Sequence, residues 1–294
     1  MKAFINCWYR NIINHGFVES LTRINANGIE LSMDYPLPFT QEIPDALIDA
    51  IRREGLEVGL HLPWRELFLA SPIPEIRELS ERIISKVITS VTSKLDPLYF
   101  VVHLSTNQSW CGPKNKLCLE AARMSLETLS QLSDELGIPL LIETVMDRCC
   151  SNEEYLPYLL MHADPGKVGV CLDIPHIIER RVKRWKVIHN PLTIVNDLPP
   201  IMLERAKVAH IHGIHVPGPY TVITHVVPSE EFLRELMQAI RSHVPHAGVG
   251  VLEIFKDITG RDINIRELRW VVSYVKEATR DERRKFRGRS SGSR

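Results

Sequence analysis

Histidines and carboxylates stand at the ends of apolar runs in this sequence. Six runs end in this way, at His61, His103, Glu143, Asp173, His210 together with His212, and Glu253. A single residue of this kind is usually a hydrogen-bonded core histidine or a salt-bridged carboxylate. A set of them gathered in one place would bring buried like charges together, which a protein tolerates when cations neutralise them. The pattern therefore predicts a divalent metal site with one to three ions, whose ligands are His61, His103, Glu143, Asp173, His210 and Glu253. Histidine and carboxylate ligands without cysteine suit zinc, manganese or ferrous iron, and the sequence does not separate zinc from manganese.

Further polar and aromatic residues follow these runs closely. His176 comes three residues after Asp173, as D-x-x-H, and His225 follows the seventh run. Trp64 and Arg65 follow the third run and offer an aromatic surface and a guanidinium for an anion. The sequence predicts substrate contacts from His176, His212, His225, Trp64 and Arg65.

Eight short apolar runs alternate with longer amphipathic stretches and would carry these residues. The predicted strands are Ala3–Cys7, Gly28–Ser32, Leu56–His61, Leu98–His103, Pro139–Glu143, Val168–Asp173, Ala206–His212 and Gly248–Ile254. The clearest predicted helices are Ile76–Leu95 and Lys116–Leu136. Eight such units without a break in composition predict an α/β fold, a single-domain (β/α)8 TIM barrel over residues 1–278. The polar strand ends would then meet at the C-terminal mouth, where these barrels carry out chemistry.

Composition narrows the classes of partner. The 294-residue chain has 36 Lys and Arg against 36 Asp and Glu, but residues 279–294 form a basic tail that we expect to be disordered. The remaining body is acidic, which disfavours nucleic acid as a partner and favours a small-molecule substrate. There is no membrane-spanning stretch or signal peptide, so we expect a cytoplasmic protein, with homo-oligomerisation left open. We expect the six cysteines to be structural thiols.

The arrangement resembles the xylose-isomerase-like TIM-barrel superfamily, which includes sugar isomerases, epimerases and endonuclease-IV-type phosphodiesterases. The resemblance rests on Glu143, Asp173, His210 and Glu253, which match the superfamily's Glu, Asp, His, Glu set on strands five to eight. His61 and His103 match two histidines that the endonuclease-IV-type branch adds. That branch also has a D-x-H pair after strand seven, where this chain has Thr224-His225. The runs HLPWRELFLASP and CLDIPH are similar to cobamide-remodelling phosphodiesterases.

The resemblance implies two activities. The first is a metal-dependent phosphodiesterase acting on a small phosphorylated molecule, such as the nucleotide loop of a cobamide. It would hold one ion with His61, His103 and Glu143, and a second ion with Glu143, Asp173, His210 and Glu253. His176 and His225 would bind a third ion or the phosphate.

The alternative is a single-metal sugar or hydroxy-ketone isomerase or epimerase with Glu143 and Glu253 as opposed catalytic bases. Abasic-site DNA cleavage is disfavoured by the charge of the body, and a non-enzymatic binding module by the completeness of the ligand set.

Overall fold

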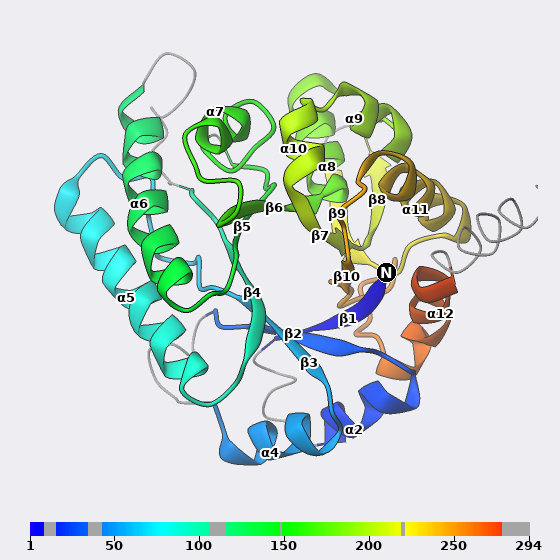
Figure 1. Ribbon diagram of the computed structural model, residues 1–294. Coiled ribbons are helices and arrows are strands. Elements are labelled where there is room, and N and C mark those ends of the chain that lie inside the picture. The colour runs from blue at the N-terminus through cyan, green and yellow to red at the C-terminus, as the bar shows by residue number, and fades with distance from the viewer. Residues whose placement is uncertain (9–15, 35–42, 106–115, 148, 219–220, 278–294) are drawn as a thin grey trace, which may run out of the picture.

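The computed structural model describes residues 1–8, 16–34, 43–105, 116–147, 149–218 and 221–277. Eight parallel strands close into one barrel, in the order β1-β10-β7-β6-β5-β4-β3-β2 (Figure 1). The strands are β1 (Lys2–Cys7), β2 (Gly28–Ser32), β3 (Glu57–His61), β4 (Pro97–Val102), β5 (Leu140–Glu143), β6 (Val168–Asp173), β7 (Ala206–Ile211) and β10 (Val249–Leu252). The predicted (β/α)8 barrel is confirmed, and each of the eight strands overlaps its predicted range. The predicted tail, residues 279–294, lies outside the described residues.

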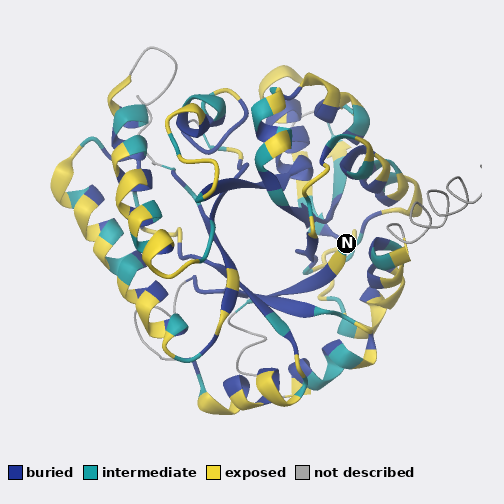
Figure 2. Cartoon of the chain, in the orientation of Figure 1, coloured by how far each residue is buried: buried dark blue, intermediate teal, exposed yellow. Residues whose placement is uncertain are grey.

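Helices surround the barrel, with their buried sides toward it and their exposed sides outward (Figure 2). They are α2 (Gly16–Arg23), α4 (Asp45–Arg53), α5 (Pro74–Thr92), α6 (Lys116–Glu135), α7 (Leu156–Met161), α8 (Ile174–Trp185), α9 (Pro191–Asp197), α10 (Pro200–Arg205), α11 (Glu230–His243), η1 (Ile265–Leu268) and α12 (Arg269–Glu277). The long helices α5 and α6 lie where apolar periodicity predicts them. Gly137, with φ of +69°, follows α6 in the left-handed conformation that glycine adopts without strain.

The inside of the barrel is filled by a separate apolar cluster. Its members are Phe4, Tyr99, Val101, Leu141, Cys171, Val208, Val249 and Val251. Tyr99 fits because the neighbouring position is Gly59, where a Cβ atom would lie 2.3 Å from the Tyr99 ring. This apolar layer lies directly below the polar residues of the barrel mouth.

An antiparallel hairpin follows β7, where we expected a loop. It consists of β8 (Gly213–Gly218) and β9 (Thr221–Val226). Alternating β-branched residues favour such pairing. The hairpin begins at Gly213, where a Cβ atom would approach the Pro228 Cα atom to 2.7 Å. The β7 strand consequently ends at Ile211, and His212 lies between β7 and the hairpin.

The cysteines differ from the expectation of structural thiols. Cys149 and Cys150, in the connection after β5, form a disulfide with each other. Cys118 is also disulfide-bonded, whereas Cys7 and Cys171 are buried free thiols. The expectation of thiols therefore holds for Cys7 and Cys171 and is wrong for the other three described cysteines, while Cys111 lies outside the described residues.

Within the described part of the chain, no helix combines the length and apolar character that a bilayer crossing requires.

Candidate metal centre

The predicted ligands meet at the C-terminal end of the barrel because side chains alternate along each strand. Leu141, Cys171 and Val208 belong to the inner apolar cluster, so the residues two positions further along also face the barrel axis. These residues are Glu143, Asp173 and His210. His61 ends β3, while His103 and Glu253 come directly after β4 and β10. The structure thus gathers all six predicted metal ligands in one place.

One group of possible ligands consists of His61, His103 and Glu143. Nε2 of His61 lies 2.9 Å from Oε2 of Glu143, and Nε2 of His103 lies 3.0 Å from the same oxygen. Nδ1 of His61 lies 3.0 Å from the Leu62 carbonyl oxygen, which fixes the ring when Nδ1 carries the proton. The group therefore offers two imidazole nitrogens and a carboxylate oxygen within 4.8 Å of one another.

A second, fully buried group consists of Glu143, Asp173, His210 and Glu253. Nδ1 of His210 lies 3.5 Å from Oε1 of Glu143, 3.5 Å from Oε2 of Glu253 and 3.8 Å from Oδ2 of Asp173. Nε2 of His210 lies 3.2 Å from Oε1 of Glu30, and neither ring nitrogen makes a hydrogen bond of normal geometry. A buried histidine without such a hydrogen bond, facing three carboxylate oxygens, fits a divalent cation with nitrogen and oxygen ligands.

Glu143 belongs to both groups and spans them. Its Oε2 atom faces His61 and His103, whereas its Oε1 atom faces His210 at 3.5 Å and Nδ1 of His176 at 3.4 Å. Burial opposes its ionisation, but the positive field of His210 and His103 outweighs burial and holds the pKa of Glu143 well below its usual value. Glu143 is thus placed to bridge two ions.

The pKa values of the other carboxylates and histidines follow their surroundings. Burial, with the nearby Glu143 charge, raises the pKa of Glu253. His176 and His212 outweigh burial and lower the pKa of Asp173 to about 2. Burial lowers the pKa of His103, whereas the hydrogen bond to Glu143 overcomes burial and raises the pKa of His61 to about 9. Positive charge on the histidines therefore offsets the charge of Glu143 and Asp173.

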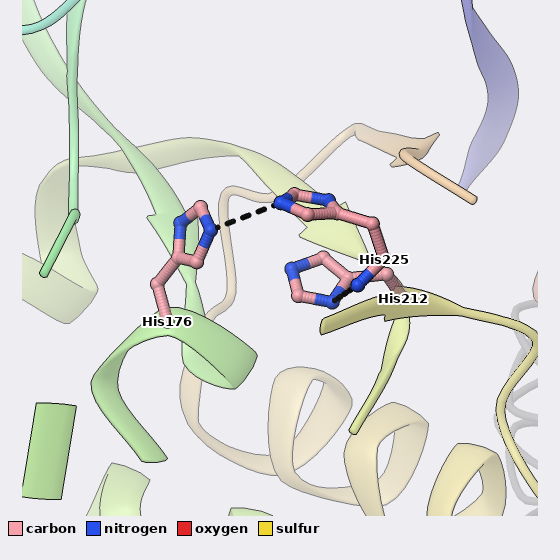
Figure 3. A group of neighbouring side chains, drawn as sticks. All are labelled: His176, His212 and His225. Atoms are coloured by element: carbon pink, nitrogen blue, oxygen red, sulfur yellow. Dashed lines mark hydrogen bonds between the residues drawn. The ribbon is translucent and has the colours of Figure 1, made fainter. Parts of the chain in front are cut away.

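Three further histidines cluster beside Asp173: His176 from the first turn of α8, His212 after β7, and His225 from β9 (Figure 3). Nε2 of His176 and Nε2 of His225 face each other at 3.3 Å. Nδ1 of His225 lies 3.1 Å from the Glu253 carbonyl oxygen, and burial lowers the pKa of His225 well below its usual value. When Nδ1 donates to that carbonyl, the Nε2 lone pair of neutral His225 is directed at His176.

His212 packs against both Asp173 and His225. It is fully buried, Nε2 lies 3.1 Å from Oδ2 of Asp173, and Nδ1 accepts from the backbone N–H of His225 at 3.1 Å. These contacts hold the His212 ring against Asp173 and His225, and its contact with the substrate stays a prediction. His225 itself has φ of +57°, a conformation that non-glycine residues adopt only where the surroundings enforce it.

Trp64 and Arg65 lie at the rim of the mouth. The Trp64 ring stacks on His103 with 5.3 Å between centroids. Arg65 lies between Trp8 and Trp64, with its guanidinium carbon 5.2 and 5.1 Å from the two ring centroids. Its Nε atom also contacts Oδ2 of the buried Asp34 at 2.9 Å. Arg65 is therefore held in place, and Asp34 offsets part of its charge.

Three functional candidates below the metal ligands were missed from the sequence. Glu30 on β2 lies 3.2 Å from Nε2 of His210, and the Tyr99 hydroxyl donates to Oε2 of Glu30 at 3.0 Å. Asn6 on β1 donates from Nδ2 to Oε1 of Glu253 at 2.8 Å. Glu30 and Asn6 are polar residues inside apolar runs, and this pattern could have identified them. The prediction rested on the ends of those runs alone.

A family described as a xylose isomerase-like TIM barrel matches residues 18–274. The chain belongs to this family. The family resemblance drawn from Glu143, Asp173, His210 and Glu253 is thereby confirmed. No curated protein sequence matches this member of the family.

Several solved structures share the fold of this family member. A D-tagatose 3-epimerase-like protein has a TM-score of 0.70 and 17% identity over 97% of this chain and 100% of its own. The D-psicose 3-epimerase of Clostridium cellulolyticum H10 has a TM-score of 0.69 and 16% identity over 95% and 99%. The TTHB071 protein of Thermus thermophilus, from crystals soaked with ZnCl2, has a TM-score of 0.63 and 18% identity over 96% and 99%. At these identities the likeness establishes the fold.

Proposed function

We propose that this protein is a divalent-metal-dependent isomerase or epimerase that acts on a small sugar or hydroxy-ketone. The observation that carries the proposal is the buried group of Glu143, Asp173, His210 and Glu253 at the barrel mouth. The similarity of the whole chain to structures named a D-tagatose 3-epimerase-like protein, a D-psicose 3-epimerase and an L-ribulose 3-epimerase supports the same class. Of the two activities implied by the sequence, the epimerase is now the better supported.

The two glutamates supply the proton chemistry in this proposal. A divalent ion, when bound, would polarise adjacent substrate oxygens and acidify the carbon between them. Glu143 ends β5 and Glu253 follows β10, and β6 and β7 separate these strands in the barrel. The carboxylates therefore approach a bound substrate from different sides, as removal and return of a proton on opposite faces requires. The raised pKa of Glu253 suits it to accept the proton, and Asn6 orients its carboxylate.

A phosphodiesterase is the second candidate, because a specific observation favours it. His61 and His103 form a further ligand group on Oε2 of Glu143, which a single-metal epimerase does not need. Two ions sharing Glu143 would suit the in-line displacement of a phosphodiester, with the ions neutralising charge on the attacking and leaving oxygens. The substrate would be a small phosphorylated molecule, such as the nucleotide loop of a cobamide.

Metal content separates the two proposals. We would measure zinc and manganese per chain by plasma mass spectrometry, in wild type and in His61→Ala/His103→Ala. The matched control is His162→Ala/His246→Ala, since both of these histidines are exposed. One ion that survives the site variant, together with 3-epimerisation of D-tagatose, D-psicose or L-ribulose, supports the epimerase.

The opposite result would overturn the epimerase. Two or three ions that fall by one in the site variant, with hydrolysis of bis(4-nitrophenyl) phosphate and no epimerisation, would identify the phosphodiesterase. Absence of metal after reconstitution with zinc or manganese would contradict both proposals.

A further inference from the structure

An apolar cavity of about 400 Å³ lies beside the candidate metal centre. The aromatic side chains of Trp8, Phe17 and Phe255 line it, and Asn6 and His225 form the part nearest the centre. Its volume lies within the range of about 300–1,000 Å³ that is usual for small-molecule sites. Neither the metal ligands nor the proposed proton transfer requires this space.

Two residues of the cavity wall contact Glu253 of the centre. Asn6, a lining residue, donates to Oε1 of Glu253 at 2.8 Å, and Nδ1 of His225 lies 3.1 Å from the Glu253 carbonyl oxygen. Asn6 and His225 therefore contact Glu253 and also line the cavity, so the two sites are adjacent.

The cavity walls are suited to a planar apolar group. The Phe255 ring lies 6.1 Å from the Trp8 ring and 5.3 Å from the His225 ring, between centroids. Aromatic rings pair at such spacings in offset or edge-to-face arrangements. Ile263 and Ile265 add aliphatic surface. Against this aromatic and aliphatic part of the wall, the hydroxyl groups of a free sugar would lose water without gaining hydrogen bonds, which is unfavourable. The polar part of the lining consists of Asn6, Thr224, His225, Lys256 and Asp262.

We infer that this cavity binds a planar apolar group, an aromatic or fused ring, that the substrate carries beside its reacting polar part. The inference rests on the proposed function in that it assumes chemistry at Glu253. It narrows the substrate from a free sugar to a sugar or hydroxy-ketone linked to a ring.

The test fills the cavity and measures binding without turnover. Indole is the probe, and its dissociation constant is measured by titration calorimetry and ligand-observed NMR. Ile263→Trp places an indole side chain in the cavity, whereas the control Ile258→Trp makes the same change at a residue that is 60% exposed and outside the cavity lining. Circular dichroism and metal content check that both variants are folded. Should Ile263→Trp fail to fold, Thr224→Trp fills the cavity from another lining residue.

We expect saturable binding to wild type and Ile258→Trp, and binding at least about 10-fold weaker in the filled variant, a change of about 1.4 kcal/mol. No saturable binding to wild type, or unchanged binding in a folded filled variant, would overturn the inference. The two proposals can be contradicted separately. If the protein is an active epimerase but does not bind indole, only the apolar subsite is contradicted. If it binds indole but has no epimerase activity, only the proposed reaction is contradicted.

Discussion

Glu143 is the residue on which the site depends most, because each of its carboxylate oxygens faces a different ligand group. Oε2 contacts His61 and His103, and Oε1 faces His176 and His210. Removal of a partner from a buried charged cluster leaves the remaining charges uncompensated, which costs more than the loss of one contact. We therefore expect the loss of metal and activity in a variant to increase with the number of ligand groups to which the substituted residue belongs.

Glu143→Ala should abolish activity and remove more metal than His61→Ala, because Glu143 belongs to both ligand groups and His61 to one. Glu143→Gln should lose activity with less change in packing. Metal per chain and turnover are measured on the same preparations, with His162→Ala as the control. Wild-type metal retention and turnover in Glu143→Ala would show that the site is assigned wrongly.

The half-buried Asp147 should make stability depend on pH. Burial raises the pKa of Asp147 from 3.8 to about 7. The folded state therefore binds a proton that the unfolded state has released between about pH 4 and 7, so the contribution of Asp147 to stability falls as pH rises through that range. Asp147→Asn removes this pH dependence, so the free energy of unfolding of the variant minus that of wild type should be larger at pH 8 than at pH 5. Urea unfolding of both proteins at pH 5 and pH 8 measures this change. A free-energy difference between variant and wild type that is the same at both pH values would contradict the raised pKa of Asp147.

At the scale of elements, the barrel strands carry two layers of side chains. The lower layer is apolar and includes Leu141, Cys171 and Val208. The upper layer, two residues further along the same strands, includes Glu143 and Asp173. Because side chains alternate along each strand, the polar ends of six separate sequence runs form one polar layer above the apolar layer. The hairpin β8–β9 then adds His225 from the side.

Gly213→Ala should destabilise the hairpin and, with it, His212 and His225. The added Cβ atom would lie 2.7–2.8 Å from backbone atoms of Pro228 and Val226, which cannot move as a flexible side chain can. Overpacking of this kind costs about 1–3 kcal/mol. Gly248→Ala is the matched control, because its Cβ atom would have nothing within 4 Å. Equal free energies of unfolding for the two variants in urea would contradict the prediction.

At the scale of the whole molecule, closure of the barrel buries groups that lie far apart in the sequence. Cys7 on β1 and Cys171 on β6 are both buried free thiols, and burial raises the pKa of each. A thiol reacts as its thiolate and only where a reagent can reach it. Their reactivity therefore reports opening of the barrel.

Cys7 and Cys171 should resist alkylation by iodoacetamide in the native protein and react fully in urea. Site-resolved mass spectrometry follows both residues, and the rate of labelling should match the rate of unfolding measured by circular dichroism. Rapid labelling of either thiol in the folded protein would show that the barrel is more open than the structure indicates.

The sequence by itself determined the barrel, the strand positions and the six proposed metal ligands. It did so because apolar runs with polar ends reflect local physics, namely alternation along a strand and the cost of isolated buried charge. Cytoplasmic localisation and a homo-oligomer stay predictions.

The resemblance already implied two ligand groups that share Glu143, and only the tertiary structure decided which side-chain atoms face one another within them. The two-sided position of Glu143, the support that Asn6, Glu30 and Tyr99 give from below, and the burial of His212 all depend on contacts across the closed barrel. Such contacts join strands that are distant in the sequence, and the register between strands sets their distances. No pattern within a single run contains that register, which is why these features required the three-dimensional structure.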